Sequence, residues 1–339
     1  MKLSDFDYSL KESTIAQTPL PHRDRSRLLV FRRETGEITH GIFLDIVEFL
    51  QPNDLLILND TKVNQARLFG RKSSNGKEIE CLLLEETEPG CWAALTRGKI
   101  SVGEEIDFGL GFVGFVIGKS GEGKREIRFL GNKDVPDLIR KKGAMPLPPY
   151  IRRPPSPEDK DCYQTVYARH EGSVAAPTAG LHFSRPLLDE IRLKGVRIAH
   201  VTLHIGPGTF QPVRTDLIEE HQMEGESYFV GQEVVQEIIK TRETGGRIVG
   251  VGTSSARVIE SLPDPVPQHH LMGKTHLFIF PGYRFRWLGG FVTNFHLPKS
   301  TPYLLTSALV GLPLLKKMYQ EAMEKGYRFY SYGDAMMVL

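Results

Sequence analysis

The residues Asp54-Leu55-Leu56-Ile57-Leu58-Asn59 form a short apolar run, and the pattern of the chain changes directly after it. Four aliphatic residues between polar ends are typical of a strand that is buried on both faces. The preceding residues 43–50 have helical spacing, and Pro52-Asn53 ends them. From residue 61 onward, strand-like runs follow one another at short intervals. This change predicts that a domain of one class is interrupted by a domain of another.

The segment 61–150 has the pattern of an all-β domain. Its strand-like runs are separated by turns rich in Gly, Asn, Ser and Pro, which is typical of a small barrel or sandwich. The predicted strands cover residues 66–71, 78–86, 91–97, 103–108, 111–118 and 125–130. A helix over 135–142 and a proline-rich stretch close the segment. We therefore predict an inserted, barrel-like all-β domain at 61–150.

The rest of the chain alternates strands and helices, which indicates an α/β domain. Ser184 can cap a helix over 184–194, Pro186 suits its first turn and Gly195 ends it. Further helices are predicted at 233–242, 254–262, 302–310 and 314–325, and strands at 196–205 and 247–251. The predicted fold is an α/β main domain, made of residues 1–60 plus 151–339, with an inserted all-β domain.

Composition excludes several classes of protein. The 339 residues are 40% hydrophobic and 25% charged with a net charge of +2, which fits neither a disordered chain nor a polycation. No apolar run reaches the ~18 residues that span a bilayer, so no membrane partner is expected. Cys81, Cys91 and Cys162 lack the spacing of a disulfide framework or a zinc site. We expect a cytoplasmic protein without a bound metal.

Several stretches combine small, polar and histidine residues in a way that a plain core does not require. Small residues let a ligand approach the backbone, and helix starts offer free N–H groups. These stretches are 175–183, 200–210, 250–257, 293–302 and 327–336. The alternative interpretations are purely structural: tight loops with a core histidine, packed turns and solvated loops. The stretch 250–257 is a weak match to a dinucleotide fingerprint, because Ser255 replaces the third glycine.

Basic residues gather in two places. One group is Arg23, Arg25, Arg27, Arg32 and Arg33; the other is Arg140, Lys141, Lys142, Arg152 and Arg153. Solvated surface would explain either group. The second group is interleaved with prolines and contains Tyr150, and a stiff basic strip with an aromatic ring suits a phosphate backbone with a base to stack. We predict that this second group contacts a nucleic-acid backbone.

With these motifs the chain closely resembles the bacterial S-adenosylmethionine:tRNA ribosyltransferase-isomerase family of the queuosine pathway. The resemblance covers essentially the whole chain. It is carried by residues 1–8, 59–63, 163–168, 175–183, 200–210, 293–301 and 327–336. The family has an α/β domain with an inserted β-barrel, which agrees with the division above. The chain departs from the family where it has Ser254-Ser255-Ala256, and this keeps the hydroxyl groups.

The resemblance implies an unusual reaction. The ribosyl part of S-adenosylmethionine is transferred to 7-aminomethyl-7-deazaguanine at the wobble position of a tRNA, and epoxyqueuosine forms while adenine and methionine leave. S-adenosylmethionine is then a consumed substrate, and no cofactor is expected. The implied partner is tRNA that carries the precursor base, and the second basic group is then the predicted tRNA-binding surface. We expect the protein to act as a monomer.

The chemistry requires a base that takes a proton from the ribose 5′ carbon, beside the sulfonium. The candidate catalytic residues are His182, His204, Asp60, His296 and Asp334, with His182 or His204 as the base. The candidate substrate-binding residues are Thr178, Gly180, Gly206, Gly208, Thr209, Thr253, Ser254, Arg257, Asn294 and Lys299.

Two other functions compete with this one. An S-adenosylmethionine-dependent RNA methyltransferase would share the ligand and the RNA partner, but it would need a glycine-rich strand-turn-helix near the start of its catalytic domain. A non-catalytic RNA-binding module built on the barrel would leave the histidine-containing motifs outside residues 61–150 unexplained.

Overall fold

The computed structural model describes residues 1–119, 123–131, 134–210 and 213–339, apart from the side chains of Thr209 and Phe210. The chain divides into two compact units. The main unit contains residues 1–62, 148–153 and 161–339, and the inserted unit contains 63–147 and 154–160. The predicted insertion at 61–150 thus differs by a few residues at each end, because 61–62 and 148–150 pack with the main unit. Residues 154–160 pack with the inserted unit instead.

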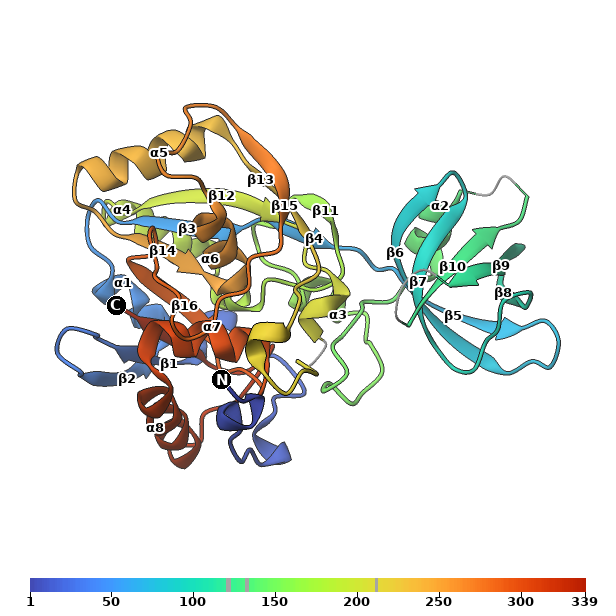
Figure 1. The fold of residues 1–339 in the computed structure, drawn as a ribbon, viewed down its shortest axis with the longest axis horizontal. Helices are drawn as coiled ribbons and strands as arrows, with labels where there is room; N and C mark the ends of the chain where they lie inside the picture. Colours follow the sequence, from blue (N-terminus) through green and yellow to red (C-terminus); the bar gives the residue numbers. More distant parts are fainter. Residues whose placement is uncertain (120–122, 132–133, 211–212) are drawn as a thin grey trace. The chain divides into compact units, whose positions relative to one another are not determined.

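A nine-stranded mixed sheet forms the centre of the main unit (Figure 1). Its order is β15-β13-β12-β3-β14-β16-β17-β1-β2. The strands are β1 (Arg27–Phe31), β2 (Ile38–Ile42), β3 (Leu55–Asn59), β12 (Arg197–Leu203), β13 (Glu226–Val230), β14 (Ile248–Val251), β15 (Leu271–Thr275), β16 (Gly290–Asn294) and β17 (Ala335–Val338). The four central strands β12, β3, β14 and β16 are parallel.

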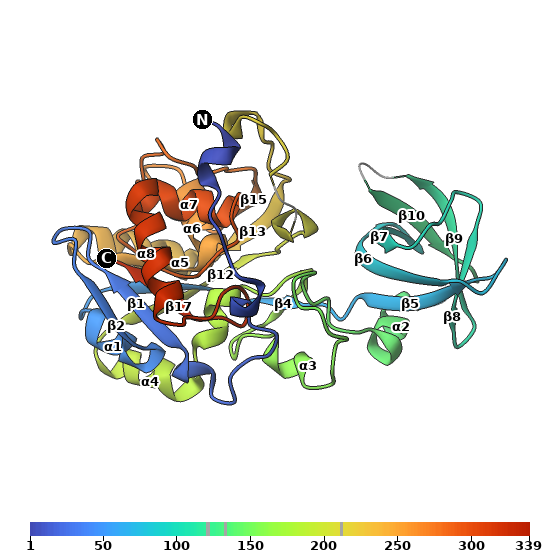
Figure 2. The same ribbon diagram turned by 90° about the horizontal axis from the view of Figure 1, so that it is seen from below.

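Helices cover both faces of this sheet because its central strands are apolar on both sides. Leu55 and Ile57 of β3 pack into one core with α5 to α8, whereas Leu56 and Leu58 pack into another with α1 and α4. Figure 2 shows α1 and α4 on one side of the sheet and α6, α7 and α8 on the other. The helices are α1 (Ile46–Phe49), α4 (Arg185–Leu193), α5 (Gln232–Glu243), α6 (Gly252–Ser261), α7 (Thr301–Val310) and α8 (Leu312–Glu324).

The inserted unit is a closed antiparallel barrel of order β10-β7-β6-β5-β8-β9. Its strands are β5 (Arg67–Lys72), β6 (Glu78–Glu88), β7 (Cys91–Arg97), β8 (Glu105–Gly109), β9 (Phe112–Lys119) and β10 (Lys124–Phe129). Alternate residues point inward, as in a half-buried strand, and α2 (Val135–Lys142) adds Val135 and Leu138 to the barrel core. The predicted fold, an α/β domain interrupted by a barrel, is confirmed.

The remaining elements are short. The strands β4 (Thr61–Val63) and β11 (His170–Ser173) pair in a two-stranded sheet, and α3 spans Asp159–Cys162; β4 and α3 each include residues of both units. A 3₁₀ helix at Thr178–His182 precedes α4, and another at Pro207–Phe210 follows β12. Among the described residues, no helix is long and apolar enough to cross a membrane.

Candidate active site

Polar motifs follow the carboxyl ends of the four central parallel strands. These strands are neighbours in the sheet, and they end at Leu203 of β12, Asn59 of β3, Val251 of β14 and Asn294 of β16. Ligands of open α/β sheets collect beyond such ends. The stretches 200–210, 250–257 and 293–302, which are far apart in the sequence, therefore meet at one edge of the sheet.

A pocket lies at this edge, and we call it the strand-end pocket. Its walls come from the loop before α4, the end of β12, the start of α6, the segment between β16 and α7, and the turn near Tyr330. It is lined by Tyr150, Ala175, Ala176, Pro177, Thr178, Ala179, Ile205, Gly252, Thr253, Ser254, Thr293, Asn294, His296, Leu297, Ser300, Pro302, Tyr330 and Ser331. Five predicted residues thus line one cavity: Thr178, Thr253, Ser254, Asn294 and His296.

Two helices begin at this pocket. Gly252 opens α6 with a φ of +79°, a conformation that disfavours a side chain, and no side chain caps this helix. No capping side chain among the described residues therefore accepts a hydrogen bond from its first N–H groups, and these groups can bind an anion. Ser300 caps α7 by accepting a hydrogen bond from Tyr303 N. The strand-end pocket therefore combines small residues with helix N-terminal donors.

Asn294 is held rigidly on the pocket wall. Its Nδ2 donates to the carbonyl oxygens of Tyr330, at 2.8 Å, and of Ser331, at 3.4 Å. This orients Oδ1 away from both carbonyls. Oδ1 of Asn294 and Oγ of Ser254 are both buried and have no hydrogen-bond partner among the described residues. Such atoms cost about 1–3 kcal/mol when they stay unsatisfied, which is a reason to expect a ligand or water beside them.

His182 is enclosed by protein. Its Nδ1 lies 2.7 Å from Ser26 Oγ, and its ring stacks on Phe43. Burial lowers the pKa of His182 to about 4, although the charge of Asp334 and the neighbouring side chain of Asn294 oppose this shift. The imidazole is therefore neutral at physiological pH. It does not line the strand-end pocket, and its low pKa makes it a weak proton acceptor.

His204 is more accessible, although it too is absent from the lining of the strand-end pocket, to which its neighbour Ile205 contributes. It is only partly buried, its Nδ1 lies 2.9 Å from Thr61 Oγ1, and its ring packs against Gly172. Burial lowers its pKa; His170 adds to this shift and Asp60 opposes it. Thr61 Oγ1 also lies 3.5 Å from the carbonyl oxygen of His170, to which it can only donate. Nδ1 of His204 then carries the proton of its bond to Thr61, and Nε2 keeps a free lone pair.

Asp60 and Asp334 are both buried and hydrogen-bonded. Asp60 accepts a 2.7 Å bond from Thr202 Oγ1, and its other oxygen lies 3.7 Å from His170 Nε2. Asp334 accepts from the backbone N–H groups of Arg27 and Arg328 and pairs with the Arg328 guanidinium at 3.3 Å. Neither lines the strand-end pocket. The arrangement gives both carboxylates the role of holding neighbouring segments in place.

His296 lines the pocket, but its ring is tied to the sheet. Its Nε2 lies 2.6 Å from Thr293 Oγ1, and burial lowers its pKa to about 3. Lys299 is turned away from the pocket residues, since its Nζ lies 2.5 Å from Asp7 Oδ2. The sequence predicted Lys299 as a substrate ligand, and in this structure its ammonium group pairs with Asp7 of the N-terminal segment.

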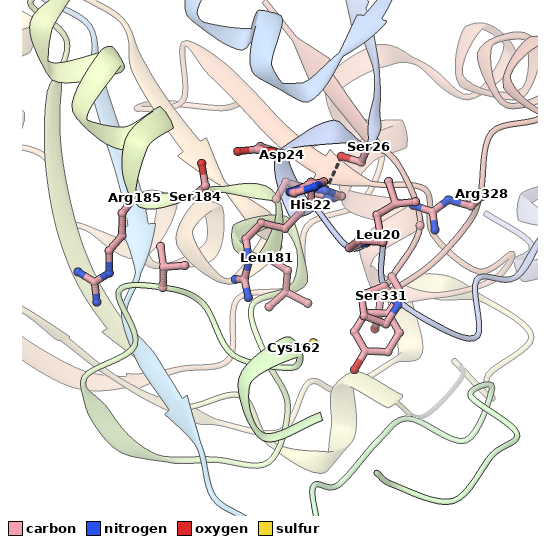
Figure 3. Close-up of a pocket in the computed structure, with 17 residues that line it drawn as sticks. Leu20, His22, Asp24, Ser26, Cys162, Leu181, Ser184, Arg185, Arg328 and Ser331 are labelled. Atoms are coloured by element: carbon pink, nitrogen blue, oxygen red, sulfur yellow. Dashed lines mark hydrogen bonds between the residues drawn. The ribbon is translucent and has the colours of Figure 1, made fainter. Parts of the chain in front are cut away.

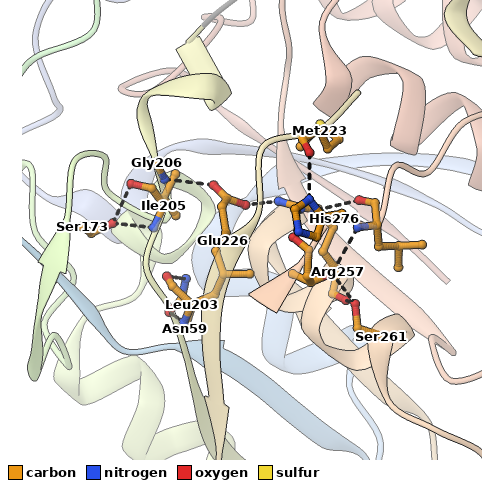
Figure 4. Close-up of polar contacts among 12 residues, drawn as sticks. Asn59, Ser173, Leu203, Ile205, Gly206, Met223, Glu226, Arg257, Ser261 and His276 are labelled. Atoms are coloured by element: carbon orange, nitrogen blue, oxygen red, sulfur yellow. Dashed lines mark hydrogen bonds and ion pairs between the residues drawn. The ribbon is translucent and has the colours of Figure 1, made fainter. Parts of the chain in front are cut away.

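Arg257 supports the loop after β12 rather than lining the pocket (Figure 4). Its guanidinium forms a buried ion pair with Glu226 and donates to the carbonyl oxygens of Thr275 and Leu277. Glu226 Oε1 in turn accepts a 3.0 Å bond from Gly206 N. Through Glu226, the Arg257–Glu226 pair thereby fixes the start of the Gly206-Pro207-Gly208 turn.

The remaining glycines of the prediction have packing roles. A Cβ atom on Gly180 would overlap the hydroxyl of Tyr167, and one on Gly208 would contact the Glu224 side chain. The side chain of Thr209 lies outside the described residues. Gly180 is therefore required by the close approach of Tyr167.

The predicted tRNA-binding residues have partners in the fold. Arg140 pairs with Asp134 and Asp137, Lys141 with Asp137, and Arg152 with Glu12 through two bonds of 2.8 and 2.9 Å. Lys142 Nζ donates to the carbonyl oxygen of Phe108, and Arg153 Nε to that of Gln17. Arg140, Lys141 and Lys142 belong to the inserted unit, whereas Arg152 and Arg153 belong to the main unit.

Sequence reasoning did not assign several residues of this region to the site. Ser26 holds His182, and Asn59 ties β3 to β12 by bonds to both backbone groups of Leu203. Tyr330 lines the strand-end pocket, as does Tyr150, which the sequence placed in the basic strip; their ring centroids are 4.8 Å apart. These residues come from separate segments, and only the buried Asn at the end of a strand was a usable signal. Among the described residues, no group of three or more His, Cys, Asp or Glu could hold a metal ion.

The fold and the site define an α/β protein with a pocket at the carboxyl ends of its central strands and with an inserted barrel. The profile of a family described as "Queuosine biosynthesis protein" matches residues 3–338, so the chain belongs to this family.

Full-length relatives agree with this assignment. Proteins named S-adenosylmethionine:tRNA ribosyltransferase-isomerase from Halothermothrix orenii and Thermotoga maritima are 48% and 46% identical to the chain, with all of each sequence covered. A crystal structure of S-adenosylmethionine tRNA ribosyltransferase from Thermotoga maritima matches with a TM-score of 0.57 at 36% identity, over 99% of this chain and 100% of that one.

Proposed function

We propose that the chain transfers the ribosyl part of S-adenosylmethionine to 7-aminomethyl-7-deazaguanine at the wobble position of tRNA and isomerises it to epoxyqueuosine. Adenine and methionine are released, and S-adenosylmethionine is consumed without another cofactor. The observation that carries this proposal is the convergence of three family motifs, 175–183, 250–257 and 293–302, on the strand-end pocket.

The chemistry of the pocket suits a nucleoside that carries an amino acid. The free N–H groups at the start of α6 suit a carboxylate, which the methionine part supplies. Ala175, Ala176 and Ala179 leave room for close approach of a ligand to the backbone. Tyr150 and Tyr330 offer aromatic faces for a flat base or for the positive sulfonium.

We assign the proton acceptor to His204 rather than His182. A base needs an accessible lone pair, and Nε2 of His204 has one when Nδ1 donates to Thr61. His182 instead has Ser26 on one nitrogen and the buried Asn294 side chain near the ring. In the proposed sequence Nε2 takes the proton from the 5′ carbon, and the electron pair left there opens the sugar ring and expels adenine, which takes up a proton. The neutral aminomethyl group then adds to the opened sugar, and methionine leaves from the 5′ carbon as the epoxide closes.

Product analysis tests the reaction. The protein is incubated with S-adenosylmethionine and tRNA that carries the precursor base, and small molecules are separated by chromatography. Ribosyl transfer releases free adenine and methionine in equal amounts. A methyltransferase would instead produce S-adenosylhomocysteine and methylated RNA, and that result would refute the proposal. We also expect the active species to be a cytoplasmic monomer, which sedimentation at working concentrations would check.

A further inference from the structure

A second pocket in the main unit lies beside the strand-end pocket, and we call it the arginine pocket (Figure 3). Its walls come from the segment before β1, the start of α4 and the turn before β17. It is lined by Pro19, Leu20, Pro21, His22, Arg23, Asp24, Ser26, Cys162, Val166, Leu181, His182, Ser184, Arg185, Arg328, Ser331, Tyr332 and Gly333. The first arginine group of the sequence, which the catalytic motifs leave unused, thus contributes to a cavity.

The two pockets share a wall. Ser331 lines both, and the 3₁₀ helix Thr178–His182 contributes Thr178 to the strand-end pocket and His182 to the arginine pocket. Tyr150 Oη lies 2.6 Å from Ser331 Oγ, which holds this wall together. A ligand in one pocket is therefore next to a ligand in the other.

The arginine pocket carries positive charge that carboxylates only partly offset. Arg23 donates to the carbonyl oxygens of Gln164 and Asp161, which orient the guanidinium without cancelling its charge. In the part of the chain that the structure describes, Arg185 forms no ion pair. It is exposed on the first turn of α4. Arg328 pairs with Asp334, and Asp24 is the acid among the lining residues.

Several basic residues at 140–153 differ from Arg23 and Arg185 because they have carboxylate partners. Arg140, Lys141 and Arg152 each lie within 3.5 Å of a carboxylate oxygen. A cation with such a partner attracts a phosphate less strongly than a cation whose partners are neutral carbonyl groups. Charge compensation therefore favours Arg23 and Arg185 over Arg140, Lys141 and Arg152 as phosphate ligands.

We propose that the arginine pocket binds phosphate groups of the tRNA beside the nucleotide that is modified. This inference rests on the proposed function, because that function places the modified base in the neighbouring strand-end pocket. The backbone of that nucleotide must remain outside, within a few ångströms of its base. Guanidinium groups match phosphate oxygens in geometry and charge, and Arg23 and Arg185 line the adjoining cavity.

The test measures the affinity for precursor tRNA as a function of salt concentration. Arg185→Gln removes one charge at an exposed position, so the fold should survive, and thermal unfolding checks this. We expect weaker binding and a slope of log K against log salt that is smaller by about one. Arg23→Gln combined with Arg185→Gln should lower the slope by about two. Lys317→Gln, on the exposed face of α8, is the matched control and should leave the slope unchanged.

The outcomes separate this inference from the proposed function. If the wild type releases adenine with tRNA and Arg185→Gln keeps the full salt slope, only the arginine pocket is refuted. The same holds if the slope falls in an Arg140→Gln/Lys141→Gln variant and not in Arg185→Gln. If the wild type releases no adenine with precursor tRNA, the proposed function fails and this inference fails with it.

Discussion

Ser26 Oγ and His182 Nδ1 lie 2.7 Å apart, and both side chains are buried beneath α1 and α4, beside the ring of Phe43. The hydrogen bond joins the segment before β1 to the 3₁₀ helix before α4, 156 residues further along the chain. Burial of the ring favours the neutral imidazole. This relationship has consequences for both stability and catalysis.

Stability should fall in mild acid because of His182. Burial lowers its folded pKa to about 4, below the ordinary 6.5. Between these values the unfolded chain binds more protons than the folded one, so the free energy of unfolding decreases as the pH falls from 6.5 towards 4. One such group changes the free energy of unfolding by on the order of 3 kcal/mol over this range.

His182→Gln should flatten this decrease in urea unfolding followed from pH 7 to pH 4.5. Ser26→Ala is the matched control, because it removes the same hydrogen bond and keeps the titrating ring. An equally steep decrease in His182→Gln would show that other histidines carry the effect.

The two candidate bases can be separated by kinetics. His204→Ala should lower turnover about 100- to 10,000-fold while both substrates still bind, because general-base removal has this size of effect. His182→Ala should act mainly through stability, so its turnover per folded molecule should fall much less. Deuterium exchange from solvent into the 5′ position of bound S-adenosylmethionine reports the proton step directly. Exchange that persists in His204→Ala and is lost in a folded His182 variant would reverse the assignment.

Gly180 and Tyr167 should show strong coupling. Alanine at position 180 would overlap the Tyr167 hydroxyl and crowd Thr165, so Gly180→Ala should destabilise the main unit by about 1–3 kcal/mol. The Tyr167 hydroxyl has no hydrogen-bond partner among the described residues, so Tyr167→Phe alone should cost little. The double variant should recover part of the loss in urea unfolding. Strict additivity would mean that the hydroxyl is not the source of the clash.

Arg257 should be a stability residue. Arg257→Ala leaves Glu226 buried without its partner, and such losses cost about 3–5 kcal/mol. Adding Glu226→Gln removes the buried charge that Arg257 no longer balances and should restore part of the stability. If Arg257→Ala unfolds normally and only raises the KM for S-adenosylmethionine, the residue binds substrate directly.

Lys299→Ala should have a much smaller effect on stability. It breaks an ion pair whose members are 38% and 51% exposed, so it should lower the free energy of unfolding by less than about 1 kcal/mol.

Local patterns were sufficient for much of the fold. The predicted helix at 135–142 is α2, and the six strand-like runs between 66 and 130 correspond to β5 to β10. Apolar periodicity and turn residues act over a few positions, so these elements can be recognised one at a time. The strands β1, β2, β4, β11, β13 and β15 to β17 were not predicted. β17 (Ala335–Val338) is an example, because it begins at the last two residues of the stretch 327–336 and becomes a strand by pairing with β1 and β16.

The sequence alone determined the division into an α/β part and a barrel, and it located the motifs that line the strand-end pocket. Only the tertiary structure decided what each side chain does there. Arg257 was a plausible ligand until Glu226, 31 residues away, paired with it. Arg152 belonged to a strip without acids until the fold brought Glu12 to it across 140 residues. Periodicity is a local property of the chain, whereas burial and charge compensation depend on which distant segments come into contact.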